Sequence, residues 1–175
     1  IKKAIELYEK HQLTAKVVEM KGWLAYNLID NQEEAFKEAT EAIALAKDKL
    51  RDEKHISTAN AYLVLGLYYS YSDVDKTFDY FFEIVDNPQT PDLTFFETVL
   101  HLNNINRPLG GKYQIKSYTD KFKSRLSNTE PYLKQYEIIY HKVMGMLAYG
   151  LMNDDKQHFI MCFFSNFPCF SLLCP

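Results

Sequence analysis

A glycine framed by aromatic residues constrains this chain more than any other feature. Residues 62–69 read Y-L-V-L-G-L-Y-Y, and Tyr62, Leu65 and Tyr69 occupy positions i, i+3 and i+7. In an α-helix these positions share one face. Gly66 lies beside them and has no side chain to hold a neighbouring helix away. The pattern predicts a helix over about 56–71 that a second helix crosses closely, so that Gly66→Leu would force the two helices apart.

Helical spacing of apolar residues recurs along most of the chain. It predicts helices over 1–11, about 14–29, 33–50, 78–85, 92–102 and 113–126, and a further helix beginning at Pro131. Turn sequences separate these segments. We expect the 30–32 and 73–75 turns to cap the helices that follow them, and residues 127–131 to end one helix and start the next.

One predicted helix carries a stripe of small residues, which would let its neighbours approach. Its members recur at helical spacing and are Ala35, Ala39, Ala42 and Ala46. A stripe of large apolar residues runs beside it, formed by Phe36, Ile43 and Leu50.

Composition favours an all-α globular chain. Of 175 residues 47% are hydrophobic and 25% charged, with only six Gly and six Pro, which argues against disorder and against a β-sandwich or barrel. The net charge of −3 lacks the excess of Lys and Arg that nucleic-acid binders carry, so we expect no direct contact with nucleic acid.

Small residues at equivalent helix positions indicate a repeat of about 40 residues. Ala25 and Gly66 are 41 residues apart (66 − 25), and Gly66 and Gly145 are 79 apart (145 − 66). The sequence Y-x-x-L-G-x-x-Y around Gly66 resembles the first helix of a tetratricopeptide repeat. This resemblance implies antiparallel helical hairpins stacked into a short right-handed superhelix over residues 1–158. HEAT-like helix pairs, which also repeat near this length, are the structural alternative.

Repeats near 40 residues that are rich in Tyr and Asn are similar to the repeat domains of bacterial Rap, Rgg and PlcR-type peptide-sensing regulators. The resemblance implies a non-enzymatic cytoplasmic module, without a cofactor, that binds a peptide or protein as the sensor or interaction part of a transcriptional regulator. The chain begins with Ile1, not Met, and already in helical spacing, so we expect a longer protein before Ile1. In many such regulators a helix-turn-helix precedes the repeats. The alternative is a structural scaffold or oligomerisation domain, such as a homodimer, that uses the same groove.

In stacked hairpins the first helices line a concave groove. The register of Gly66 assigns partner-binding positions to this groove: Tyr26, Asn60, Leu63, Leu67, Ser70, Tyr71, Asn103, Asn104, Lys142 and Tyr149. Asn amides donate to and accept from a peptide backbone at once, and Tyr adds stacking area and a hydroxyl. The alternative is that these are ordinary groove residues without a partner.

Motifs that carry catalysis or metal binding are missing from the sequence. The five His residues share no metal-ligand spacing, and residues 108–112 lack the spacing of a phosphate loop. We expect His101 and His141 to be packed or edge residues, and Asp73 and Asp75 to be turn and cap carboxylates. No catalytic residue and no metal ligand is predicted.

The last 17 residues, 159–175, form a separate segment without a charged residue, and they contain Cys162, Cys169 and Cys174. The segment is a poor membrane span, and its Cys spacing fits no zinc site. Three interpretations remain open: a cap on the last repeat, a non-native end, or an anchor to a membrane or partner. With no other Cys in the chain, a reducing cytoplasm is the simplest location.

Overall fold

The computed structural model describes residues 1–106, 108–134 and 141, and in this part of the chain every regular element is helical. The all-α prediction is therefore confirmed. The chain divides into two compact units, Ile1–Ile105 and Asn106–Pro175. No helix of the described residues combines the length and the apolar run needed to cross a bilayer.

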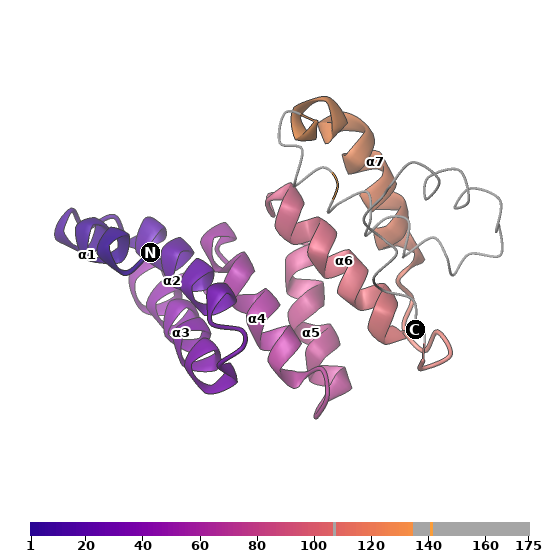
Figure 1. The fold of residues 1–175 in the computed structure, drawn as a ribbon, viewed down its shortest axis with the longest axis horizontal. Coiled ribbons are helices and arrows are strands. Elements are labelled where there is room, and N and C mark those ends of the chain that lie inside the picture. Colours follow the sequence, from indigo (N-terminus) through magenta and orange to yellow (C-terminus); the bar gives the residue numbers. More distant parts are fainter. Residues whose placement is uncertain (107, 135–140, 142–175) are drawn as a thin grey trace. The chain divides into compact units, whose positions relative to one another are not determined.

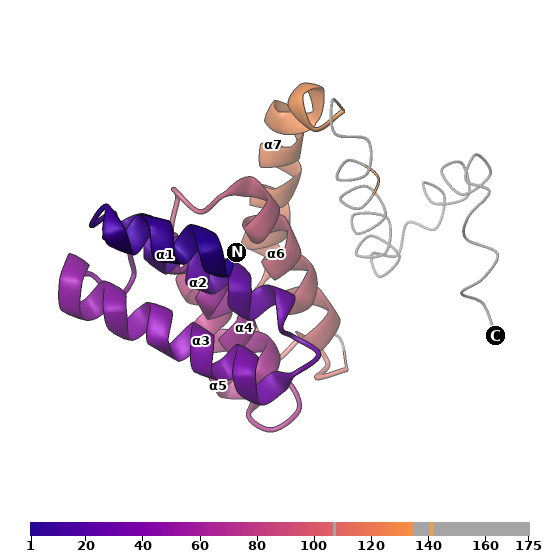
Figure 2. The ribbon, with the colours of Figure 1, turned by 60° about the vertical axis from the view of Figure 1, so that its left-hand side comes forward.

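The first unit is built from consecutive helices that pack beside one another (Figures 1 and 2). The helices are α1 (Lys2–Lys10), α2 (Thr14–Asn27), α3 (Gln32–Leu45), α4 (Ala59–Tyr69), α5 (Val74–Val85) and α6 (Asp92–Asn106). A π-helical turn, Ala46–Leu50, extends α3, and a 3₁₀ turn, Ile56–Thr58, leads into α4. Short turns make α2 with α3 and α4 with α5 into antiparallel hairpins, and α4 also packs against both helices of the preceding hairpin.

The predicted stripe of alanines forms the contact surface of α3. Its four side chains are at most 1% exposed and belong to one core cluster with Val18 and Ala25 of α2 and with Ala61 and Val64 of α4. The large residues of the neighbouring stripe pack against this cluster. Small side chains at the centre let three helices meet in one core, and the larger ones fill the space around it.

Gly66 lies at a close contact between α4 and α5. A Cβ atom added at this position would overlap the ring of Phe81, which is fully buried on α5. Tyr62 and Tyr69 both contact the ring of Tyr80, each with a centroid separation of 5.9 Å. The predicted close crossing at Gly66 is therefore confirmed, with α5 as the second helix.

The two predicted capping turns behave differently. The carboxylate of Asp73 accepts a hydrogen bond of 3.0 Å from the backbone N–H of Lys76 and so caps α5 as expected. Asn31 precedes α3, but its side chain makes no capping hydrogen bond, so that part of the prediction is wrong. The Asn31 side chain is exposed, which leaves water to solvate the first N–H groups of α3.

The second unit begins with a loop closed by Asn106. Its Nδ2 donates to the carbonyl of Tyr113 and its Oδ1 accepts from the Tyr113 N–H, both at 2.9 Å. Gly110 and Gly111 adopt positive φ angles of 65° and 75° in this loop, a conformation that glycine adopts without steric cost. The side chain of Asn106 thus stabilises the connection before α7 (Lys116–Leu133).

The helix boundary expected at residues 127–131 is wrong, because α7 spans this stretch. The helix continues through this stretch and contains Pro131 near its end. The hydroxyls of Ser127 and Thr129 donate to the carbonyls of Lys123 and Arg125 one turn earlier, at 3.0 Å each. These side chains therefore bond back into the helix and do not cap a new one. Gly145 and the predicted boundary at residue 158 lie outside the described residues.

Candidate binding pocket

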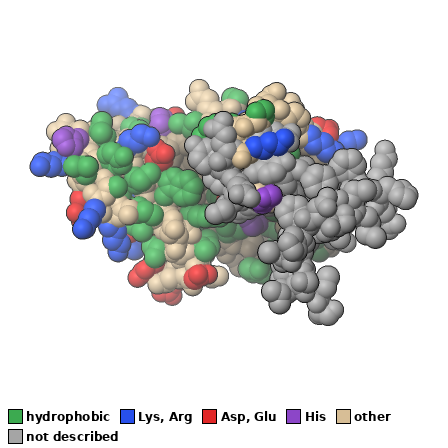
Figure 3. All heavy atoms as spheres, turned by 45° about the horizontal axis from the view of Figure 1, so that its top comes forward, with side chains coloured by type: hydrophobic (Ala, Val, Ile, Leu, Met, Phe, Trp, Pro, Cys, Tyr) green, Lys and Arg blue, Asp and Glu red, His purple; other side chains and the backbone are tan. Residues whose placement is uncertain are grey.

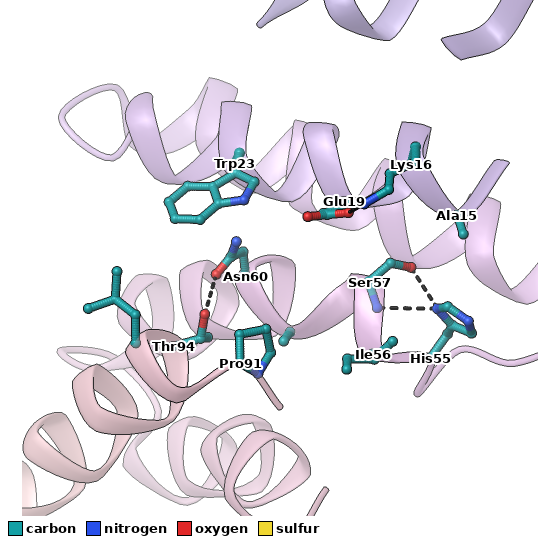
Figure 4. Close-up of a pocket in the computed structure, with 12 residues that line it drawn as sticks. Ala15, Lys16, Glu19, Trp23, His55, Ile56, Ser57, Asn60, Pro91 and Thr94 are labelled. Carbon is teal, nitrogen blue, oxygen red and sulfur yellow. Dashed lines mark hydrogen bonds and ion pairs between the residues drawn. The ribbon is translucent and has the colours of Figure 1, made fainter. Parts of the chain in front are cut away.

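A cavity of about 390 Å³ opens in the first unit between α2, the segment leading into α4, and the start of α6 (Figure 4). Twelve residues line it: Ala15, Lys16, Glu19, Trp23, His55, Ile56, Ser57, Ala59, Asn60, Pro91, Leu93 and Thr94. The volume falls in the range of small-molecule and side-chain binding sites. Three helices that are distant in sequence therefore build one concave site.

A second glycine brings two walls of this pocket together. A Cβ atom on Gly22 of α2 would lie 3.2 Å from the backbone nitrogen of Ala61 and 3.2 Å from Cβ of Asn60, both on α4. The absence of a side chain at this point lets α2 approach α4 closely. As a result Trp23 and Asn60 face one another across the pocket (Figure 4).

Asn60 is the central polar group of the pocket. It is 9% exposed, and its Oδ1 accepts a hydrogen bond of 2.9 Å from Oγ1 of Thr94 on α6. In Figure 4 its Nδ2 points toward Trp23 and the cavity. No acceptor in the described part of the chain bonds this Nδ2. Its two N–H groups are therefore available to donate to a ligand that enters the cavity.

The wall opposite Thr94 is ordered by His55. Its Nδ1 accepts a hydrogen bond of 3.2 Å from the backbone N–H of Ser57 and lies 2.8 Å from the Ser57 hydroxyl oxygen. The imidazole thereby caps the 3₁₀ turn that lines the pocket. The Nδ1 atom of His55 therefore stabilises the turn that forms this wall.

Two charged side chains stand at the rim. Nζ of Lys16 donates to Oε2 of Glu19 at 2.8 Å, one turn apart on α2. The hydrogen bond to Glu19 raises the pKa of Lys16 above its ordinary value. The pair therefore places both charges at the pocket while leaving no net charge there.

The structure places the predicted partner-binding residues in several environments. Asn60 lines the pocket, whereas Leu63 is 1% exposed and lies in the interior, not on an open groove. Tyr26 reaches from α2 to α6, where its hydroxyl donates to Glu97 at 3.1 Å. The other described members are half-buried, apart from Tyr71 at 96% exposure: Leu67, Ser70, Asn103 and Asn104. Lys142 and Tyr149 lie outside the described residues.

Sequence reasoning missed most of the pocket wall. Trp23, Glu19 and Thr94 were not predicted, although Trp23 lies one helical turn before the predicted Tyr26. The available signal was Gly22, an interior helix glycine that marks the approach of α2 to α4.

The described residues were also compared with the arrangements that hold metal ions. No group of His, Cys, Asp or Glu in that part of the chain could hold a metal ion. His101 stacks against Phe81 with ring centroids 6.0 Å apart, as expected of a packed histidine. Comparison with protein-family models, curated proteins and solved structures gives no match.

Proposed function

We propose that this protein is a tetratricopeptide-like helical-repeat module that binds a peptide or protein segment along the face formed by α2, α4 and α6. The observation that carries the proposal is the pocket between these three helices, with the free amide of Asn60 inside it. These helices are the first members of the predicted hairpins. In stacked-hairpin proteins such helices line the ligand-binding groove.

A peptide backbone suits the free donor of Asn60. Each residue of an extended peptide carries a carbonyl that seeks a donor. The amide also has its Oδ1 fixed by Thr94, so Nδ2 is held in position before a ligand arrives. Pre-organisation of this kind lowers the entropic cost of binding.

Surface charge agrees with a peptide or protein ligand. On the face drawn in Figure 3, hydrophobic side chains gather over the described part of the first unit, with both basic and acidic side chains around them. The net charge of the chain is −3. A polyanionic ligand would need a concentration of basic residues instead. By the sequence resemblance, the module would serve as the sensor or interaction part of a bacterial regulator.

Panning the full 175-residue chain against a library of random short peptides tests this function. We expect recovered peptides to bind the native chain and to lose roughly tenfold in affinity with Asn60→Ala, about the value of one buried hydrogen bond. Asn31→Ala is the matched control, because it removes an exposed Asn side chain that does not line the pocket.

Two results would contradict the proposal. One is a library that yields no peptide bound through this face. The other is a stable, concentration-independent oligomer in light scattering whose interface covers the pocket, which would make the groove a scaffold contact.

A further inference from the structure

The chemistry of the pocket restricts which part of a partner it accepts. Half of its lining is apolar and comes from all three helices: Ala15, Trp23, Ile56, Ala59, Pro91 and Leu93. Trp23 supplies a large flat surface opposite Pro91 (Figure 4). Burying an apolar group against such walls is favourable in proportion to the area removed from water.

The rim adds no unpaired charge. Lys16 and Glu19 are the charged residues that line the pocket, and they satisfy each other at 2.8 Å. A charged ligand side chain entering the pocket would lose hydration without finding a free counter-charge. The rim therefore disfavours cationic and anionic side chains alike.

The donor at the centre of the pocket, Nδ2 of Asn60, can bond an acceptor that lies close to the apolar walls. Nδ2 of Asn60 points into the space below Trp23 (Figure 4). A backbone carbonyl next to an inserted side chain brings an acceptor and an apolar group into the pocket together. One residue of an extended peptide thus satisfies both features.

We infer that the cavity is an anchor pocket that takes one uncharged apolar side chain of the bound segment, and that the Lys16–Glu19 pair enforces this choice. The inference rests on the proposed function and defines its ligand class. The carbonyl of the anchored residue, or of its neighbour, accepts from Asn60. Trp23 and Pro91 enclose the inserted side chain.

Removing one charge at a time from the rim tests the inference. Glu19→Gln leaves Lys16 unpaired, and Lys16→Met leaves Glu19 unpaired. With the native chain we expect peptides from the random library to share one apolar, uncharged anchor position. Acidic residues should become enriched at that position with Glu19→Gln and basic ones with Lys16→Met, by roughly two- to fivefold, the scale of a partly exposed ion pair.

Glu83→Gln is the matched control, because Glu83 pairs with Lys54 at 2.6 Å and does not line the pocket. Its library should resemble that of the native chain. The inference is overturned if the native chain selects charged anchors, or if neither rim variant changes the selected residues. Either result leaves the proposed function standing, whereas the recovery of no peptide at all contradicts the proposed function itself.

Discussion

Gly66 and Phe81 show how a single residue decides the geometry of a helix pair. Glycine inside a helix costs about 1 kcal/mol relative to alanine, so a helix keeps it only where another interaction compensates. Here the compensation is the buried ring of Phe81, which occupies the place of a side chain. The sequence predicts the close approach from the glycine alone. It does not identify Phe81, because four aromatic residues of α5 compete for that position.

Gly66→Ala should destabilise the protein even though alanine is the better helix former. The added methyl overlaps Phe81, and overpacking of a core typically costs about 1–3 kcal/mol of unfolding free energy. In a Phe81→Leu background the same change should cost much less. Urea unfolding of the four chains in this double-mutant cycle measures the coupling. Additive free energies would show that Gly66 and Phe81 do not meet.

Tyr62 should make the stability of the protein fall at high pH. Burial raises the pKa of its hydroxyl from 10.0 to about 12, and the hydroxyl donates to the carbonyl of Glu53 at 3.2 Å. The folded state therefore holds the proton more tightly, so its contribution is complete below pH 10 and is lost as the pH rises toward 12.

Unfolding free energies of the native chain and Tyr62→Phe across this pH range check the prediction. The unfolding free energy of the native chain should fall relative to that of Tyr62→Phe as the pH rises from 10 toward 12. Tyr71→Phe is the control, since Tyr71 is 96% exposed and its removal should leave the pH profile unchanged. A parallel profile for the native chain and Tyr62→Phe would refute the assignment.

At the level of whole elements, the helices follow apolar spacing, but their ends follow local hydrogen bonds. The spacing predicts α1 to α6 with ends shifted by a few residues. It fails at α7, where Pro131 lies within the helix although it reads as a helix start. Proline lacks an N–H but still fits a helical φ, and Pro131 lies only two residues before the end of α7. Apolar spacing does not distinguish a proline near the end of a helix from one at its start.

The caps of α3 and α5 provide a comparison between two helices of one unit. Asp73→Ala should lower the unfolding free energy by about 1 kcal/mol, because it removes the bond to the Lys76 N–H. Asn31→Ala should cost little, because the Asn31 side chain makes no such bond. Urea unfolding compares the two variants. Equal losses would mean that the side chain of Asn31 caps α3 after all.

At the level of the molecule, packing between hairpins determines the pocket, and this is the part that sequence predicts least. Asn60 is predicted from the register of α4, because register fixes which residues share a face. Trp23, Thr94 and Pro91 reach the pocket only through the approach of α2 and α6 to α4. Those contacts link residues far apart in the chain, so periodicity within one helix does not predict them. For the same reason Leu63, placed on the groove by register, is buried instead.

Trp23 makes the central claim directly measurable, because it is the single tryptophan of the chain and lines the pocket. Its fluorescence should therefore report ligand entry. Titration with a peptide recovered from the random library should change the Trp23 emission saturably, with the same affinity that calorimetry gives. The change should weaken with Asn60→Ala and persist with Asn31→Ala. Calorimetric binding that leaves the Trp23 emission unchanged would place the ligand elsewhere and contradict the account.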